Sequence, residues 1–421
     1  MKKFFLTCMC ALMVFIGQGT QYVQAQSPVI SVYVDGLKVD FDVDPVIQNG
    51  RTLVPFRAIA EALGVDVSWD ASSQTVKAVH QEKSIALQIG NATAMVNESQ
   101  VRLEANPIIQ QGRTMIPLRF FSENLSAEVK WEETTRTVRI SSPPSDMNVM
   151  AFYALGDRDT SSWTNLFGAE YPNRETGYTD IVDELGLGWY SLDAGGTLVK
   201  NSPSGWKQPE GWESVLEAAR ESRMGTDMVV HLPDRSPTMM SILGDEKSTQ
   251  QAIDNILEEA KEYFSGINLD IEGLGYNETP EQLLETKSRF NHFVRRLSEQ
   301  ARQQGLSITL TLHPPNSVYK GYDYSTLGEI ADAIVIMAYD YHQDRARLPE
   351  PLHKVTEAVS MALENVPAEK LVLGISAYQE NEQSIVEKIG VAKRYKLRGI
   401  ALWRLGLITD KHGEALRQAI Q

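Results

Sequence analysis

Short apolar runs alternate with amphipathic stretches through the second half of the chain, over 147–421. Eight runs predict strands, at 148–155, 187–194, 227–233, 266–273, 307–314, 333–341, 371–378 and 399–406. Their near-continuous apolar character fits parallel strands that are buried on both faces. Between them, 210–224, 248–264 and 280–305 repeat apolar residues every three or four positions, as helices covering a sheet do. This alternation predicts a (β/α)8 barrel, with a doubly wound sheet as the alternative.

The front half follows a different pattern, which occurs twice at a constant spacing without a gap. DPVIQNGRTLVPFRAIAEALGVDVSWD begins at Asp44, and NPIIQQGRTMIPLRFFSENLSAEVKWE begins at Asn106. Each copy predicts a short strand, a turn at Gly50 or Gly112, an amphipathic helix that follows a proline, and two more strands. The two copies predict a small α+β domain over 28–141. A linker at 142–146 follows, stiffened by two prolines, and the barrel domain then runs over 147–421.

The repeated GRT-(L/M)-(V/I)-P-x-R signature resembles the N-terminal domain of copper amine oxidases, which also serves as a stalk in secreted Gram-positive proteins. Copper is not implied, because neither copy has a cluster of histidines or cysteines. Four side chains recur at equivalent places: Arg57, Arg119, Trp69 and Trp131. They could contact wall glycan, but their repetition favours packing and pairing within each unit.

The segment 1–25 has the pattern of a secretory signal peptide. Lys2 and Lys3 precede an apolar run from Phe4 to Ile16 that is too short for a stable anchor, and small or aliphatic residues lead to a cleavage site after Ala25. An uncleaved anchor is the alternative. We therefore expect a secreted protein.

Composition excludes several classes of function. Both cysteines, Cys8 and Cys10, lie in the predicted signal peptide, so the mature chain would have neither a disulfide nor thiol chemistry. A net charge of -15 without a basic block argues against nucleic acid or an anionic membrane surface as a partner. No segment after the signal peptide is long and apolar enough to span a membrane.

Polar residues collect at the C-terminal ends of the predicted strands, where barrels of this kind carry their chemistry. The stretch YFSGINLDIEGLG places Asn268, Asp270 and Glu272 on one face of a strand. Two neighbouring buried carboxyl groups shift each other's pKa, so that one can hold a proton near neutral pH. A protonated Glu beside an ionised Asp suits a glycosidase. A purely structural polar cluster inside the barrel is the alternative.

Three motifs in the right order resemble family 18 glycoside hydrolases, the chitinase-like enzymes. SGINLDIEG is similar to the family's DGxDxDxE motif, MAYDYH at 337–342 to its strand-six motif, and GIALWRLG at 399–406 to its strand-eight Trp motif. Asn268 in an acidic position of the motif resembles the branch that acts on peptidoglycan of spores and cell walls. The resemblance implies retaining hydrolysis in which the substrate's own acetamido oxygen attacks the anomeric carbon, and it implies no cofactor.

Carried over by position, the resemblance implies three catalytic residues. Glu272 would be the general acid, Asp270 would orient the acetamido group, and Tyr339 would donate a hydrogen bond to its carbonyl. Asp340 would contact the sugar, and Trp403 would form the apolar floor beneath it. The other substrate-binding candidates are Asn268, Tyr378 and Trp206, the last in a loop after the second strand.

Two positions depart from the family motif. Ser265 replaces its first Asp, which is mostly supportive, so we expect a modest effect. Asn268 replaces the middle Asp. Its amide is expected to hydrogen-bond Asp270 without sharing a proton, which would alter the pH profile.

A metal site is not expected. His231, His313 and His342 lie on or near strand ends, and a metal would need them to converge with Asp270, as in sugar deacetylases. No His-x-His or His-x-x-x-His spacing appears among them.

The leading hypothesis is a secreted hydrolase of β-1,4-linked N-acetylglucosamine glycan in peptidoglycan, held at the cell wall or spore by its repeated front domain. A chitinase or chitooligosaccharide hydrolase is the second hypothesis. A non-catalytic glycan-binding barrel is the third, and the intact pair of Asp270 and Glu272 argues against it.

Overall fold

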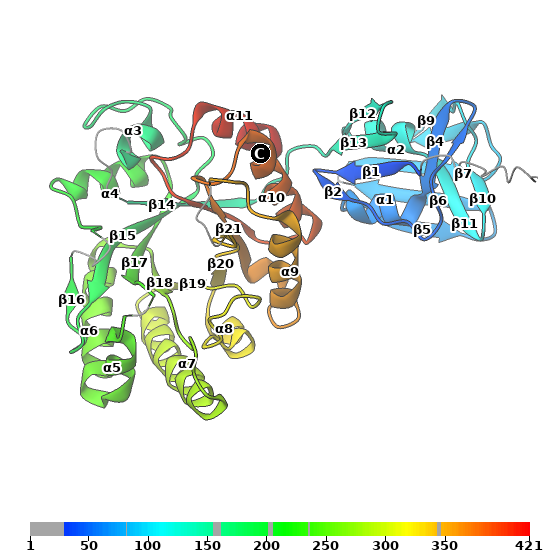
Figure 1. Ribbon diagram of the computed structural model, residues 1–421. Coiled ribbons are helices and arrows are strands. Elements are labelled where there is room, and N and C mark those ends of the chain that lie inside the picture. The colour runs from blue at the N-terminus through cyan, green and yellow to red at the C-terminus, as the bar shows by residue number, and fades with distance from the viewer. Residues whose placement is uncertain (1–28, 81, 155–160, 201–204, 235, 343–346) are drawn as a thin grey trace, which may run out of the picture.

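The computed structural model describes residues 29–80, 82–154, 161–200, 205–234, 236–342 and 347–421. The predicted signal peptide at 1–25 lies outside these residues. Two folded units follow each other along the chain (Figure 1): a mainly β unit, drawn in blue to cyan, and a larger barrel with helices around it. Among the described residues, no helix combines the length and the apolar character needed to cross a membrane.

Eight parallel strands close the barrel. They are β14 (Asn148–Tyr153), β15 (Glu184–Leu192), β17 (Gly225–Leu232), β18 (Gly266–Ile271), β19 (Ser307–Leu312), β20 (Ala333–Ile336), β21 (Leu371–Ser376) and β22 (Gly399–Trp403). Each pairs with the next, and β14 pairs with both β15 and β22. This closure confirms the predicted (β/α)8 barrel and excludes a doubly wound sheet, which would have two free edges. The short β16 (Leu198–Val199) extends β15 as an antiparallel hairpin.

Helices cover the outside of the barrel. They are α3 (Ser162–Phe167), α4 (Trp212–Glu221), α5 (Thr238–Gly244), α6 (Glu246–Tyr263), α7 (Pro280–Gln303), α8 (Tyr324–Ile330), α9 (Leu352–Leu363), the 3-10 helix η1 (Ala368–Lys370), α10 (Glu382–Arg394) and α11 (Asp410–Ala419). The three predicted helical stretches correspond to α4, α6 and α7. Thr279 and Gln282 form a capping box at the start of α7, which fixes where this long helix begins.

The strands divide their side chains between two cores. On β18, Ile267, Leu269 and Ile271 belong to the large core between strands and helices. A smaller cluster inside the barrel contains Phe152 and has Trp403 packed against it. Residues of β18 that alternate with the helix-facing set therefore point inward, and this places Asn268 and Asp270 inside the barrel.

The front unit contains both copies of the repeat. Its elements are β1 (Ser31–Val34), β2 (Leu37–Lys38), β3 (Val46–Gln48), β4 (Arg51–Pro55), α1 (Phe56–Ala62), β5 (Asp66–Asp70), β6 (Thr75–His80), β7 (Lys83–Gln88), β8 (Thr93–Val96), β9 (Ser99–Arg102), β10 (Ile108–Gln110), β11 (Arg113–Pro117), α2 (Leu118–Asn124), β12 (Glu128–Glu132) and β13 (Thr137–Ser141). The predicted elements are present in order in both copies, whereas β4 and β11, each between the turn and the helix, and β1, β2 and β7 to β9 are additional. The copies join where β4 pairs with β11.

The front unit is bound to the barrel through α10, and β2 lies next to that helix (Figure 1). Leu37 is part of the barrel's own core. The Arg394 guanidinium donates hydrogen bonds to the carbonyls of Leu37 and Lys38 at 3.2 and 3.1 Å. Lys393 donates to the Ser142 hydroxyl and the Pro143 carbonyl, each at 3.0 Å. The predicted linker is therefore held against the barrel in this structure.

Candidate active site

Asp270 and Glu272 lie together at the C-terminal end of β18. Asp270 is 1% exposed, whereas the Glu272 side chain is 24% exposed. The buried Tyr322 hydroxyl donates to the Ile271 carbonyl at 2.8 Å and accepts from the Leu274 N–H at 3.2 Å. These bonds fix the backbone on both sides of Glu272, so its carboxyl group is held at the mouth of the barrel.

His231 completes a group of three titratable side chains. It lies on β17 directly beside Asp270 in the strand register, and its Nε2 is 3.5 Å from Glu272 Oε1. The possible ligand atoms of His231, Asp270 and Glu272 all lie within 4.8 Å of one another, close enough to hold a metal ion. Sequence spacing could not reveal this convergence, because it comes from pairing between two strands that α5 and α6 separate along the chain.

The electrostatics of the site act most strongly on Asp270. Burial raises its pKa to about 7; the His231 charge opposes this effect and the Glu272 charge adds to it. Within the described residues, neither carboxylate oxygen of Asp270 accepts a hydrogen bond. Burial lowers the pKa of His231, but the hydrogen bond to Glu272 and the two negative charges outweigh it, so that pKa is raised. Burial therefore favours the protonated form of Asp270, the deeper carboxyl group of the pair.

Asn268 does not support Asp270 in the expected way. Its Oδ1 accepts a hydrogen bond from the Thr311 hydroxyl at 2.9 Å, and its Nδ2 lies 3.9 Å from the Met150 sulfur. The expectation that this amide bonds to Asp270 is therefore wrong in this structure, because Asn268 satisfies its polar atoms deeper in the barrel. As a substrate-binding candidate it is fully buried.

Ser265 lies at the opposite end of β18 from the site. Its hydroxyl donates to the Thr226 carbonyl at 2.9 Å and accepts from the Thr226 N–H at 2.8 Å. The side chain therefore joins β17 to β18 at the base of the barrel, and this agrees with the supportive role expected for the first motif position.

Tyr339 and Asp340 follow β20 and belong to the same electrostatic group. Burial raises the pKa of Tyr339 well above its usual value, and the charges of Asp270, Glu272 and Asp340 raise it further. Asp340 has a left-handed backbone with φ of 61°, and its carboxylate accepts a hydrogen bond from Gln379 Nε2 at 3.0 Å. Strand β20 ends at Ile336, earlier than predicted, so both residues lie on a loop.

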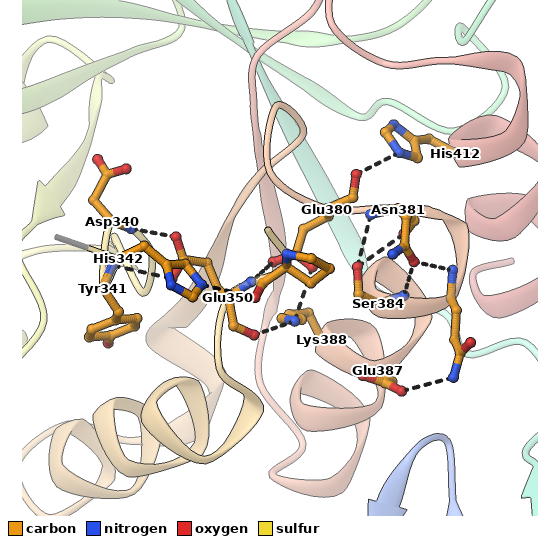
Figure 2. A network of polar contacts seen from close by, with 12 residues as sticks. Asp340, Tyr341, His342, Glu350, Glu380, Asn381, Ser384, Glu387, Lys388 and His412 are labelled. Atoms are coloured by element: carbon orange, nitrogen blue, oxygen red, sulfur yellow. Dashed lines mark hydrogen bonds and ion pairs between the residues drawn. The ribbon is translucent and has the colours of Figure 1, made fainter. Parts of the chain in front are cut away.

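A buried polar network holds this loop (Figure 2). The Glu350 carboxylate accepts hydrogen bonds from the backbone N–H groups of Asp340 and Tyr341, at 2.8 and 3.2 Å. The Glu350 N–H donates to Glu380 Oε1 at 3.2 Å, and its carbonyl accepts from Lys388 Nζ at 2.8 Å. Lys388 also forms an ion pair with Glu380 at 3.0 Å, with side chains 3% and 1% exposed. The sequence pattern did not reveal this support, because its members come from three separate segments.

Trp403 and Trp206 stack against each other above the barrel interior. Their ring centroids are 4.7 Å apart with an interplanar angle of 19°, and Trp206 also stacks on His231 at 5.8 Å. The ring centroids of Phe152 and Trp403 are 5.2 Å apart. A Cβ on Gly188 would come within 2.3 Å of the Trp206 ring, so this glycine allows the ring its position. The structure thus joins both tryptophans to the group formed by His231, Asp270 and Glu272.

Tyr378 is another predicted site residue without a described contact to this group. Its side chain is 48% exposed, and the Arg347 guanidinium lies 4.1 Å from the centre of its ring. Of the other two histidines considered, His313 stacks on Tyr319 at 4.0 Å, and His342 Nε2 is within 3.2 Å of the Pro349 carbonyl. His231 is the histidine that reaches the carboxyl pair directly.

Comparisons with known proteins agree with the two-part architecture. Residues 33–140 match the family model of the copper amine oxidase N-terminal domain, and residues 205–382 match that of glycosyl hydrolases family 18. The chain is 30% identical over 146 residues to a cortical fragment-lytic enzyme of Bacillus subtilis (strain 168), with 32% of each chain covered. It is 25% identical over 122 residues to a putative sporulation-specific glycosylase, YdhD, of the same organism, with 27% of each covered. The chain thus spans about a third of the length of these curated relatives.

Solved structures share the fold. The chitinase of Chromobacterium violaceum ATCC 12472 superposes with a TM-score of 0.52 at 19% identity, covering 65% of this chain and 98% of that one. The spore cortex-lytic enzyme SleL of Bacillus cereus superposes with a TM-score of 0.53 at 17% identity, covering 67% of this chain and 76% of that one. The barrel, its carboxyl pair and the matched motifs agree with these matches: over 205–382 the chain is similar to glycosyl hydrolases family 18, and over 33–140 it is similar to the copper amine oxidase N-terminal domain.

Proposed function

We propose that this protein is a secreted, retaining glycoside hydrolase that cleaves β-1,4-linked N-acetylglucosamine glycan in peptidoglycan of the cell wall or spore cortex. The observation that carries the proposal is the carboxyl pair. Asp270 is buried without a hydrogen-bond partner among the described residues, beside a more exposed Glu272. A buried, unpaired carboxyl group is costly unless a ligand uses it. The lytic enzymes and glycosylases among the relatives support the choice of peptidoglycan.

The reaction proposed for this pair begins with one shared proton. Glu272, the more exposed member, donates it to the glycosidic oxygen as the bond from that oxygen to the anomeric carbon breaks. The substrate's acetamido oxygen forms the new bond to the anomeric carbon and yields an oxazolinium ion. Asp270 accepts the acetamido N–H, and Tyr339 donates to the oxygen. A water molecule then attacks the anomeric carbon from the face that the leaving group left, the bond from that carbon to the acetamido oxygen breaks, and the water proton passes to Glu272. Two inversions give overall retention.

Products released from purified peptidoglycan and from chitin test this proposal. The wild-type protein should release reducing N-acetylated fragments from peptidoglycan, and a chemically de-N-acetylated sample of the same polymer should resist cleavage, because it lacks the attacking group. Release from chitin alone would support a chitinase and contradict the choice of peptidoglycan. Binding without release from either polymer would support the non-catalytic hypothesis instead.

Asp270→Asn should stabilise the folded protein increasingly as pH rises. The folded pKa of Asp270, about 7, lies above the ordinary value of 3.8, so between these values the folded chain keeps a proton that the unfolded chain has released. Wild-type stability therefore falls as pH rises through this window, whereas Asn has no proton to lose. The stability advantage of the variant should grow by roughly 2–4 kcal/mol between pH 4 and pH 8 in urea unfolding.

The exposed Asp254→Asn on α6 is the matched control, and its difference from wild type should not grow over the same range. If Asp270→Asn also shows a constant difference, the carboxyl group of Asp270 is ionised in the folded protein at neutral pH.

Trp206→Ala should tighten the binding of short N-acetylglucosamine oligomers in a Glu272→Gln background. The two tryptophan rings are already in contact at 4.7 Å, so a sugar can stack on that face of Trp403 only after Trp206 moves away. Removing the ring removes the cost of this movement and should lower Kd several-fold in calorimetry. Gly188→Ala, whose Cβ would meet the same ring, should act in the same direction. Weaker binding in both variants would show instead that Trp206 itself holds the sugar.

A further inference from the structure

The front unit has a local two-fold symmetry that centres on the pairing of β4 with β11. In this antiparallel pair Val54 lies opposite Ile116, which is its own counterpart in the second copy. The neighbouring pairs show the same relation. Leu53 lies opposite Pro117, and their counterparts in the other copy, Met115 and Pro55, lie opposite each other. A rotation of half a turn about the centre therefore relates β3 and β4 to β10 and β11, whose pairings have the same register. A surface feature built on these strands is expected to occur twice.

Two grooves on this unit follow that symmetry. Groove A is a hollow of about 510 Å³ lined by Arg57, Trp69, Ile109 and Arg113. Groove B is a hollow of about 670 Å³ lined by the counterparts of these residues: Arg119, Trp131, Ile47 and Arg51. Each groove combines the helix and following strand of one copy with the glycine turn of the other. We expected these arginines and tryptophans to pack and pair within their own copy, and Arg119 does pair with Glu123 there. Each groove is nevertheless lined by residues of both copies.

The groove side chains are more exposed than structural packing requires. Trp69, Ile47 and Ile109 are 40%, 48% and 51% exposed, and both isoleucines occupy the same place in their copies. The tryptophan, the isoleucine and both arginines of each groove are among the residues that are identical in the two copies. Exposed apolar side chains that recur in this way indicate contact with a partner.

The chemistry of the grooves fits sugar rings. An indole face packs against the C–H face of a pyranose, while guanidinium and carboxylate groups meet its hydroxyls. The ion pairs are themselves repeated: Arg51 pairs with Glu104, and Arg113 pairs with Asp42, the counterpart of Glu104. Because positive and negative groups are balanced in this way, the grooves suit a largely uncharged ligand rather than a polyanion.

We propose that grooves A and B each bind a saccharide segment of the same insoluble N-acetylated glycan on which the barrel acts, an inference that rests on the proposed function. A glycan strand has a reducing and a non-reducing end, so two sites related by a half turn would bind one straight strand in opposite orientations. The two grooves therefore bind two strands, or two segments that run in opposite directions. An insoluble polymer network contains such strands side by side. The contacts of α10 with β2 and the linker hold the grooves to the barrel, so binding keeps the barrel at the polymer surface.

Sedimentation with insoluble peptidoglycan tests the proposal, using the full chain with Glu272→Gln so that the polymer stays intact. Trp69→Ala and Trp131→Ala should each weaken binding about 10-fold or more, and the double variant about 100-fold, because two linked sites give avidity. Val79→Ala, which removes a 55% exposed side chain outside both grooves, is the control and should bind like the parent. Trp131 also packs on the core of the unit, so Arg57→Ala with Arg119→Ala provides a second pair of variants with a smaller risk of misfolding.

Two results would overturn the proposal. The first is a double variant that sediments within two-fold of the parent. The second is a dimer of the parent without glycan that the double variant loses, which would make the grooves a contact between two copies of the chain. Failure of the barrel's function is detected separately: with Glu272 restored, the double tryptophan variant should hydrolyse soluble N-acetylglucosamine oligomers like the wild type and should lose rate on the insoluble polymer.

Discussion

Glu272→Gln should lower the rate of glycan hydrolysis by about 10³-fold while the protein remains folded. Glutamine has nearly the same shape as glutamate, but it cannot deliver a proton to the leaving oxygen. The side chain sits at the barrel mouth and is 24% exposed, so the substitution changes a group that solvent reaches and leaves the packed core intact. Initial rates on a soluble N-acetylglucosamine oligomer, together with a thermal unfolding curve, would measure both parts of the prediction.

Glu299→Gln on the exposed face of α7 provides the matched control, since it makes the same chemical change away from the site. Its rate should stay within two-fold of the wild type. A Glu272→Gln variant that retains more than a tenth of the wild-type rate would rule out Glu272 as the general acid. His231 would then be the next group to replace.

Lys388→Met should lower the free energy of unfolding by about 3–5 kcal/mol, because it leaves the buried Glu380 carboxylate without its partner. The two side chains are 3% and 1% exposed and 3.0 Å apart, so little water reaches the remaining charge. The same ammonium also donates to the Glu350 carbonyl at 2.8 Å, and Glu350 holds the backbone of Asp340 and Tyr341 (Figure 2). We therefore expect a loss of hydrolytic rate to accompany the loss of stability.

Urea unfolding followed by circular dichroism would measure this change. The exposed pair of Lys411 and Glu382, at 3.1 Å with 72% and 51% exposure, is the comparison, and Lys411→Met should cost less than about 1 kcal/mol. Adding Glu380→Gln to Lys388→Met should recover part of the stability, since it removes the uncompensated charge. Equal costs for Lys388→Met and Lys411→Met would mean that water reaches the buried pair.

The two copies of the front unit show what an internal repeat can and cannot predict. The order of strand, turn, helix and two strands could be predicted, because Gly50, Gly112 and the prolines before the helices mark local backbone geometry. The joining of the copies through β4 and β11 could not, since strand pairing depends on contacts between residues that are far apart along the chain. The grooves arise from this pairing and were missed for the same reason.

The sequence by itself determined the eight strands, three of the helices between them (α4, α6 and α7), and the candidate carboxyl pair. Apolar periodicity reports which faces are buried, and the alternation of side chains along a strand sets Asp270 beside Glu272 without reference to the rest of the fold. Only the tertiary structure decided how this pair is tuned. His231 lies beside Asp270 because of the register in which β17 pairs with β18. Asn268 accepts a hydrogen bond from Thr311 instead of bonding to Asp270, and burial raises the pKa of Asp270. A pKa depends on burial and on charges from several strands, and these distances exist only after the barrel has closed.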